Sequence, residues 1–289
     1  MLITSKPVDP AGSAALLDVL RGRRAVVLAG AGVSTESGIP DYRGPDSVNR
    51  NRKPMQYQEF VRSEASRARY WARSAIGWPR MAAARPNAGH TALADLEASG
   101  LVQGVITQNV DGLHQAAGSR RVVELHGSLA WVCCLACGAR QPRDAFQAEL
   151  TRLNPDRAEW VQRLHHERAE MAPDGDAEVS ASAVEHFEVP PCAVCGGVMK
   201  PDVVFFGENV PRARVDDAWD LFEAGEVLLV LGSSLTVYSG RRFADRARSE
   251  GKPIAIVNVG PTRADDFAAV KIDARIGAVL PEVVRQLAG

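Results

Sequence analysis

A glycine-rich segment at residues 30–44, GAGVSTESGIPDYRG, follows directly on the apolar run at residues 25–29. Glycines after a buried strand let backbone N–H groups at a helix N-terminus approach the phosphates of a nucleotide. We therefore expect Gly30 and Gly32 to bring amides against a pyrophosphate. Dinucleotide enzymes that transfer hydride carry G-x-G-x-x-G, but the third glycine is replaced here by Thr35. The segment predicts a nucleotide site without predicting hydride transfer.

Other polar segments end the apolar runs that we expect to be strands. They are TQNVDGLH at residues 107–114, ELHG at 124–127, GSS at 232–234 and NVG at 258–260. Ligands of open α/β sheets bind beyond the carboxyl ends of the strands, so these segments should meet the glycine loop in one crevice. A single histidine such as His126 is more often a hydrogen-bonded core residue than a base. Several polar strand ends at one crevice favour a general base instead.

The cysteines form two C-x-x-C pairs, Cys134 with Cys137 and Cys192 with Cys195. Two such pairs predict a tetrahedral zinc site, and four thiolates leave no position for a catalytic water, so the metal should be structural. We expect binding of about 10–16 kcal/mol to fold a module with little core of its own. Disulfides or a redox pair are the alternative reading. Cys133 could replace Cys134, but with poorer spacing.

Alternating strands and helices must position these residues. Apolar runs predict strands at residues 25–29, 102–107, 122–125, 227–231, 254–259 and 270–272. Helical periodicity predicts helices at residues 13–21, 91–99, 212–224, 240–250 and 276–288. Nearly all-apolar strands that alternate with helices indicate a parallel sheet covered on both faces. The fold class is therefore α/β, a doubly wound, Rossmann-like domain.

Two regions interrupt the alternation and read as insertions. Residues 45–87 are rich in arginine and aromatic residues and predict helices and a cofactor loop, and residues 129–202 hold every cysteine. We expect a nucleotide-binding domain made of residues 1–44, 88–128 and 203–289. Residues 45–87 would be a helical insertion and residues 129–202 a zinc-binding module.

The composition excludes several classes of protein. The net charge of the 289 residues is −1, which provides no global field for binding nucleic acid or anionic lipid. No stretch approaches the roughly 20 apolar residues that span a bilayer, and the first twelve residues lack the blocks of a secretion signal. We therefore expect a cytoplasmic enzyme that binds neither nucleic acid nor membrane.

Taken together, the motifs resemble those of the sirtuin family of NAD-dependent protein deacylases. GAGVSTESGIPDYR, TQNVDGLH, ELHG, the two C-x-x-C pairs, KPDVVFFGE, GSS and NVG occur in the family's order within residues 14–288. YWARSAIGWP, LNPD, APDGD and KPDVVFFGENVP are most similar to class II, the branch that includes the mitochondrial sirtuin associated with ADP-ribosyl transfer and lipoamide removal. An arginine- and alanine-rich composition suggests a bacterial member.

The resemblance implies that NAD⁺ is a co-substrate bound at many of these positions. The implied contacts are Gly30, Ala31, Gly32, Thr35, Asp41, Tyr42, Arg43, Gln108, Asn109, Asp111, Gly232, Ser233, Ser234, Asn258, Val259, Gly260 and Ile276. Asp111 would hold the nicotinamide carboxamide, and the residues from Gly232 onward would hold the adenosine half. Ile276 stands where relatives usually carry cysteine, and its contact would be through the backbone. His126, Asn109 and Asp111 would be the catalytic residues.

The implied reaction removes an acyl group from lysine. The bond between nicotinamide and ribose joins a good leaving group to a carbon that tolerates positive charge, so a weak nucleophile held in line is sufficient. An acyl-lysine amide oxygen would serve, and His126 would take a proton from a ribose hydroxyl. The products are deacylated lysine, nicotinamide and 2′-O-acyl-ADP-ribose. The acyl-lysine peptide is expected to pair with an extended edge. That edge consists of Val203, Val204, Phe205, Phe206 and Gly207.

Three other functions remain open on the sequence alone. A protein side chain or water could capture the ribosyl group, which would make the protein an ADP-ribosyltransferase, and a lipoamidase-type deacylase is a further enzymatic alternative. A non-enzymatic NAD-sensing module would bind NAD⁺ without releasing nicotinamide. The polar set Asn109, Asp111 and His126 argues against that last alternative. The sequence does not identify the preferred acyl group.

Overall fold

Six parallel strands form the main sheet of the computed structural model, which describes residues 10–42, 44, 54–155, 173–175 and 186–288. The strand order is β3-β2-β1-β7-β8-β9. The strands are β1 (Ala25–Ala29), β2 (Val102–Thr107), β3 (Val122–Glu124), β7 (Val227–Leu231), β8 (Ile254–Val257) and β9 (Val270–Ile272). This is the order of the doubly wound dinucleotide-binding fold, so the predicted fold class is confirmed.

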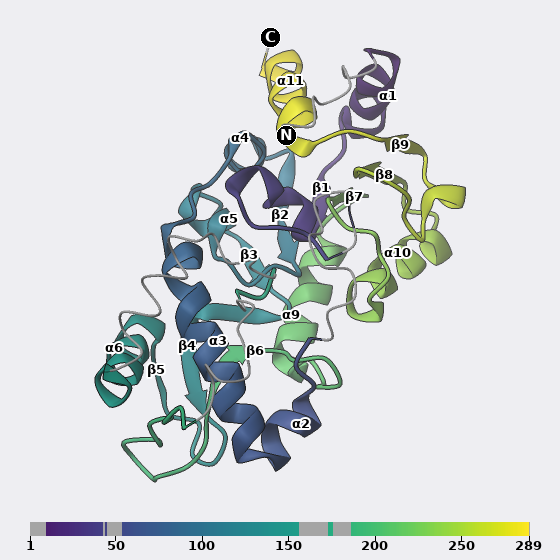
Figure 1. The fold of residues 1–289 in the computed structure, drawn as a ribbon. Helices are drawn as coiled ribbons and strands as arrows, with labels where there is room; N and C mark the ends of the chain where they lie inside the picture. The colour runs from purple at the N-terminus through teal and green to yellow at the C-terminus, as the bar shows by residue number, and fades with distance from the viewer. Residues whose placement is uncertain (1–9, 43, 45–53, 156–172, 176–185, 289) are drawn as a thin grey trace.

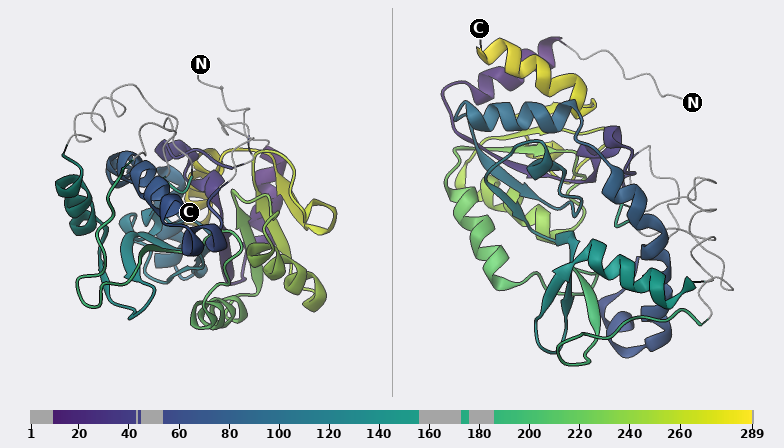
Figure 2. Two further views of the ribbon diagram at one scale, coloured as in Figure 1. Left: turned by 60° about the horizontal axis from the view of Figure 1, so that its bottom comes forward. Right: turned by 90° about the vertical axis from the view of Figure 1, so that its left-hand side faces the viewer.

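Helices cover both faces of this sheet (Figures 1 and 2). One face packs against α1 (Pro10–Leu20), α4 (Ala88–Ala98) and α11 (Ile276–Ala288). The other face packs against α9 (Arg212–Glu223) and α10 (Tyr238–Glu250). Successive residues of a strand point to opposite faces, so strand β1 contributes to both cores and all five of its residues are buried. This double burial explains why the strands are almost entirely apolar in sequence.

The chain changes direction across the sheet between β1 and β7, which are neighbours in space. From β1 it winds outward through β2 and β3, and after the smaller domain it returns to β7 and winds the other way through β8 and β9. The connections that follow β1 and β7 therefore lead to helices on opposite faces of the sheet, α4 and α10. Such a switch point opens a crevice at the carboxyl ends of the strands.

A second, antiparallel sheet has the order β5-β4-β6, with β4 (Gly127–Cys134) between β5 (Arg140–Pro142) and β6 (Met199–Val203). It packs with α2 (Tyr57–Arg62), α3 (Glu64–Ala83) and α6 (Arg143–Leu153) in the lower half of Figure 1. Trp71 of α3 lies in this core, and its Nε1–H donates to the carbonyl of Met199 at 3.1 Å. The cysteine module therefore shares its apolar core with the helical insertion, which agrees with the prediction that it has little core of its own.

The chain after β1 also differs from the prediction. The expected helix N-terminus is replaced by two short 3₁₀ turns, Ala31–Val33 and Thr35–Ser37. The short α5 (Leu113–Ala116) and a third 3₁₀ turn (Asp265–Phe267) complete the elements of the described residues. No helix in the described ranges is long and apolar enough to cross a membrane.

Candidate functional site

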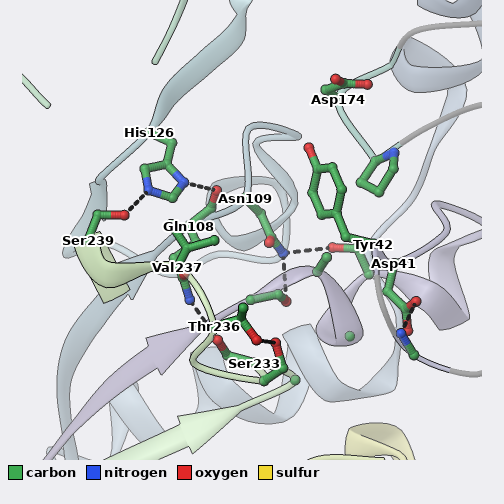
Figure 3. A pocket seen from close by; sticks show the side chains of 18 of the residues that line it. Asp41, Tyr42, Gln108, Asn109, His126, Asp174, Ser233, Thr236, Val237 and Ser239 are labelled. Carbon is green, nitrogen blue, oxygen red and sulfur yellow. Dashed lines mark hydrogen bonds between the residues drawn. The ribbon is translucent and has the colours of Figure 1, made fainter. Parts of the chain in front are cut away.

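A cavity of about 1190 Å³ lies beyond the carboxyl ends of β1, β2, β7 and β8 and extends to the end of β6. Its wall includes the glycine loop, the segment after β2, His126, the end of the smaller sheet and the loops after β7 and β8. Figure 3 shows the middle of this wall, where His126, Asn109 and Tyr42 come from three different segments. The crevice predicted from the polar strand ends therefore exists as one continuous site.

Gly30 and Gly32 allow the loops after β1 and β7 to touch. A Cβ atom on Gly30 would lie 2.7 Å from the carbonyl oxygen of Gly232, and one on Gly32 would lie 2.8 Å from the Cα of Gly232. The N–H of Gly30 donates to Leu231 and the N–H of Gly32 donates to Gly232. These two amides are thus used within the protein, which contradicts the expectation that they face a phosphate. The two glycines instead give the loops clearance at the switch point.

Side chains outside the cavity hold the glycine loop in place. The Asn87 amide donates to the carbonyl of Val33 at 2.8 Å and to Ser37 Oγ at 2.9 Å, while its oxygen accepts from the first amides of α4. Glu36 accepts from the N–H of Gly277 at 2.9 Å, in the first turn of α11. The loop is therefore fixed to two helices of the sheet domain before any ligand binds.

Asn109 and Asp111 are joined through a serine. The Asn109 amide donates to the Gly30 carbonyl at 3.1 Å and to Ser34 Oγ at 3.2 Å, and Ser34 in turn donates to an Asp111 carboxylate oxygen at 2.7 Å. The other Asp111 oxygen accepts from the N–H of Leu113 at 2.9 Å. Asn109 and Ser34 are buried. These hydrogen bonds hold the Asn109 amide and the Asp111 carboxylate at the cavity, and both groups can hydrogen-bond a carboxamide.

His126 lies at the junction of the two sheets. Gly127, which follows it, has φ +82°, and a Cβ there would lie 2.0 Å from the Asp202 carbonyl oxygen, so only glycine permits the turn from β3 into β4. The imidazole Nδ1 lies 3.0 Å from the carbonyl oxygen of Gln108, and Nε2 lies 2.7 Å from Ser239 Oγ. Because a carbonyl only accepts, Nδ1 carries the proton and Nε2 offers its lone pair.

The pKa of His126 is lower than usual, chiefly because burial disfavours the charged imidazolium. The hydrogen bond to the Gln108 carbonyl opposes this shift, whereas the positive charges of Arg242 and Arg214 add to it. His126 is therefore neutral at pH 7, the state that a general base requires.

The loops after β7 and β8 form the far end of the cavity. The Gln108 amide donates to Ser233 Oγ at 2.9 Å and so connects this end to the segment that holds His126. Asn258 donates to the carbonyl of Gly260 at 3.0 Å, and the Gly260 N–H donates to Asp273 at 3.0 Å. The hydroxyl, amide and carboxylate groups here suit the sugar and base of a nucleotide.

The residues predicted to bind the peptide line the near side of the cavity. Strand β6 ends at Val203, the Val204 N–H donates to the His126 carbonyl at 2.8 Å, and Phe205 begins a turn in which its carbonyl accepts from the Glu208 N–H. The Phe206 carbonyl accepts from Tyr57 of α2. The segment is therefore a strand only at Val203, pairs with Gln56 in an isolated parallel β-bridge at Phe206, and turns at Gly207.

A buried ion pair fixes that turn. Lys200 is 3% exposed, and its Nζ lies 3.0 Å from Glu208, donates to the Val203 carbonyl and sits 4.6 Å from the centre of the Phe205 ring. Glu208 also accepts from the Phe205 N–H at 2.8 Å. Removing one partner of a buried ion pair leaves a charge without compensation, so both residues stabilise this wall of the cavity.

The four predicted zinc ligands come together. The Sγ atoms of Cys134 and Cys195 are 3.5 Å apart, those of Cys137 and Cys192 are 3.8 Å apart, and all four lie within 4.8 Å of one another. Zinc bound to four thiolates at about 2.3 Å has sulfur atoms about 3.8 Å apart, so the cluster fits that metal. The separations far exceed the roughly 2.05 Å of a disulfide bond. Cys133 lies outside the cluster, which confirms the choice of Cys134.

Comparison with known proteins identifies the family. Residues 30–239 match the Sir2 family. The NAD-dependent protein deacetylase of Xanthomonas axonopodis pv. citri is 52% identical over 88% of this chain and 84% of its own length, and NAD-dependent protein deacetylase 1 of Streptomyces coelicolor is 50% identical over 95% and 89%. The chain belongs to the Sir2 family. A solved structure described as "Sir2-p53 peptide-NAD+" has a TM-score of 0.73 and 32% identity, and the match covers 94% of this chain and 97% of that one.

Most of the predicted site residues of this Sir2-family chain line the cavity. They are Gly30, Ala31, Gly32, Asp41, Tyr42, Gln108, Asn109, Asp111, His126, Val203, Val204, Phe205, Phe206, Gly207, Gly232, Ser233, Ser234, Asn258, Val259 and Gly260. Arg43 lies outside the described residues. Thr35 and Ile276 are not among the lining residues: the Thr35 hydroxyl donates to the Gly32 carbonyl and accepts from Arg275, and Ile276 is 2% exposed at the start of α11.

Several residues of the Sir2-family site were not predicted. Ser34 and Ser239 hydrogen-bond the proposed catalytic groups directly, and Asp174 lines the cavity beside Tyr42 (Figure 3). Ser34 belongs to the polar run after Gly32, which was a usable signal. Ser239 lies five residues after the GSS segment and Asp174 lies within the APDGD segment, but neither was assigned to the site, and only the folded chain brings them there.

Two buried histidines lie next to Asp111. The rings of His90 and His114 are 4.9 Å apart, both residues are almost fully buried, and neither ring nitrogen of His114 has a hydrogen-bond partner among the described residues. Burial, aided by the neighbouring His90, lowers the pKa of His114 to about 3. Burial also lowers the pKa of His90, although Asp111 opposes that shift. Both rings are neutral at pH 7.

This pair should destabilise the protein in acid. His114 is protonated near pH 6.5 in the unfolded chain but only near pH 3 in the folded chain. Its protonation therefore favours the unfolded chain, so the free energy of unfolding is highest above pH 6.5 and decreases as the pH falls toward 3. At pH 5 the loss from His114 is about 2 kcal/mol. We expect His114→Asn to reduce the fall in unfolding free energy between pH 7 and pH 5 by about that amount. Urea unfolding at the two pH values measures it.

The matched control is His186→Ala, which removes an exposed histidine in the smaller domain. It should leave the pH dependence of the unfolding free energy at the wild-type value. An equal fall in the wild type and His114→Asn would show that His114 titrates normally in the folded protein.

Proposed function

We propose that this chain is an NAD-dependent protein lysine deacylase that converts NAD⁺ and an acyl-lysine side chain to free lysine, nicotinamide and 2′-O-acyl-ADP-ribose. The observation that supports it best is the neutral His126, whose Nε2 lone pair faces Ser239 Oγ in the wall of the cavity that the glycine loop and the Val203 edge also line. The relatives named NAD-dependent protein deacetylases, at about half identity over most of the chain, support the same reaction.

The residues take the following roles in this proposal. NAD⁺ supplies an activated glycosidic bond. Asn109 and Asp111, held through Ser34, orient the nicotinamide end, and His126 accepts a proton at Nε2 from a ribose hydroxyl. The loops after β7 and β8 hold the adenosine half of NAD⁺, and the Val203–Gly207 segment holds the acyl-lysine.

We also propose that the acyl group is neutral. The lining residues Ile39, Met55, Val110 and Phe205 are apolar, and the basic group beside Phe205, Lys200, is already paired with Glu208. A carboxylated acyl group would lose its hydration against these apolar side chains without gaining a free cation beside them among the described residues. Acetyl and larger neutral groups therefore fit better than succinyl.

Three finer statements belong to the same proposal. The chain is a class II member, supported by the segments of its sequence that are similar to that branch. Its NAD-binding domain comprises residues 1–44, 88–128 and 203–289, with a helical insertion at 45–87 and a zinc-binding module at 129–202, a division supported by the positions of the two sheets. It acts in the cytoplasm of a bacterium, because a cluster of reduced thiolates persists in a reducing compartment.

The direct test incubates the protein with NAD⁺ and an acetyl-lysine peptide. We expect nicotinamide and the free-lysine peptide to form in equal amounts and neither to form without NAD⁺. A succinyl peptide at the same NAD⁺ concentration should react more slowly. Deacylation in the absence of NAD⁺ would contradict the proposed reaction. An ADP-ribose adduct on protein, detected by mass spectrometry, would mean that the protein is an ADP-ribosyltransferase instead.

A further inference from the structure

Both ring nitrogens of His126 are tied to one segment, residues 232–239, which runs from the end of β7 to the first turn of α10. Nε2 accepts directly from the Ser239 hydroxyl at 2.7 Å. Nδ1 donates to the carbonyl of Gln108, whose side chain donates to Ser233 Oγ at 2.9 Å. Figure 3 shows Ser239 and Gln108 on opposite sides of the imidazole. The segment that lines the far end of the cavity therefore also holds the proposed base.

The direction of each bond follows from the atoms. Nδ1 must donate because its partner is a carbonyl, so Nε2 has a lone pair and no proton. The Ser239 hydroxyl must then be the donor to Nε2. An imidazole nitrogen has one in-plane lone pair, which accepts one strong hydrogen bond. The atom that should receive a proton from the ribose is therefore already occupied by a side chain of the protein.

We propose that Ser239 is a positioning residue that occupies the base lone pair of His126 in the free enzyme and is displaced from it by a ribose hydroxyl of the bound nucleotide. The inference rests on the proposed function, which brings that hydroxyl to Nε2. In the free state Ser239 keeps the ring in the tautomer that can act as a base. Displacement then frees the Ser239 hydroxyl at the first turn of α10. Binding of the ribose hydroxyl at Nε2 is therefore coupled to the contacts of residues 232–239, the segment that lines the adenosine end of the cavity.

Among the groups around His126, Ser239 is the one that a ribose hydroxyl would replace at Nε2. The charged residues facing the ring are Arg214 of α9 and Arg242 of α10, and Asp202 of β6 binds Arg214 at 2.6 Å. The arginines disfavour a second positive charge on the ring but cannot donate to Nε2 while Ser239 occupies it. Serine can leave by rotation about one side-chain bond, without movement of the backbone.

The test compares the wild type with Ser239→Ala by ¹⁵N NMR of the histidine ring nitrogens and by binding of ADP-ribose, which carries the ribose hydroxyls but cannot react. In the free proteins, the Nε2 resonance of His126 should differ between the two, because the variant has lost the hydroxyl donor. With ADP-ribose bound, the two resonances should coincide. The variant should bind ADP-ribose about 2- to 10-fold more tightly, since no internal hydrogen bond has to break.

Two further variants control the comparison. Ser239→Thr retains a hydroxyl and should keep the wild-type resonance and affinity. Ser249→Ala lies on the same helix but away from the cavity, where its hydroxyl donates to the Arg246 carbonyl, and it should match the wild type in both measurements. His126→Ala, which removes the resonance, assigns it.

Three outcomes would overturn the inference. Identical Nε2 resonances in the free wild type and Ser239→Ala would mean that the serine does not occupy the lone pair. Weaker ADP-ribose binding by Ser239→Ala would mean that the serine contacts the ligand and is not displaced by it. Resonances that still differ at saturation would mean that the ribose never reaches Nε2. If the wild type binds no ADP-ribose at all, the proposed function fails together with the inference.

Discussion

Replacing His126 with alanine is expected to lower deacylation turnover by about 10²- to 10⁴-fold while NAD⁺ still binds. The imidazole is the neutral group whose lone pair lies at the cavity wall, and its loss removes the acceptor for a ribose proton. Binding should survive because the nucleotide is held mainly by other elements, the glycine loop and the loops after β7 and β8. Steady-state turnover and isothermal titration with NAD⁺ measure the two effects separately.

The pH dependence of the wild type gives the same assignment by another route. The base acts in its neutral form, and the pKa of His126 lies below its usual value of about 6.5, so kcat/KM should fall only as the pH drops below that value. The control is His186→Ala, which removes an exposed histidine away from the cavity and should keep the wild-type turnover. Wild-type turnover in His126→Ala, or an acidic limb well above pH 6.5, would remove His126 from the mechanism.

The sequence predicts the sheet well because burial on both faces leaves its strands no polar positions. Strands at 25–29, 102–107, 227–231 and 270–272 begin and end at the predicted residues. The predicted strand 254–259 ends instead at Val257, because Asn258 turns the chain and bonds its own loop. Capping extends helix α4 beyond the periodic pattern, since Asn87 accepts from the amides of Gly89 and His90. Local polar bonds at element ends thus account for the differences.

Site residues were predictable where they follow a strand and not where tertiary structure brings them in. Gln108, Asn109 and Ser233 come directly after buried strands, so sheet topology alone sends them to the crevice. Ser239 follows β7 by several residues, and its role depends on where β3 ends on the other side of the sheet. Thr35 is not among the lining residues, because a 3₁₀ turn places its hydroxyl against the Gly32 carbonyl, where it also accepts from Arg275; its contact with NAD⁺ stays a prediction.

The smaller domain depends on contacts between distant segments that sequence periodicity cannot predict. Its strands β4, β5 and β6 are antiparallel and partly exposed, and their core depends on Trp71 and Phe146, whose rings meet at 4.6 Å from helices far apart in sequence. The C-x-x-C spacing and the aromatic residues of 45–87 marked this region in advance, but neither predicted its sheet. Cys134 and Cys137 form the turn between β4 and β5, whereas Cys192 and Cys195 precede β6. A bound metal therefore ties the ends of the two outer strands to the central one.

Removing the metal should melt that end of the smaller domain and leave the parallel sheet folded. Structural zinc sites contribute about 10–16 kcal/mol in isolated peptides, but here the shared apolar core remains after the thiolates are lost. We therefore expect Cys192→Ser to abolish zinc content, to lower the melting temperature and to open the chain around the two C-x-x-C turns to protease, with the six-stranded domain still resistant. Cys133→Ser, adjacent to the cluster but not part of it, should retain one zinc per chain and the wild-type melting curve.

Elemental analysis and limited proteolysis distinguish the two variants. An unchanged melting curve for Cys192→Ser would refute a structural role for the four thiolates, and loss of zinc from Cys133→Ser would mean that the ligand set is wrong.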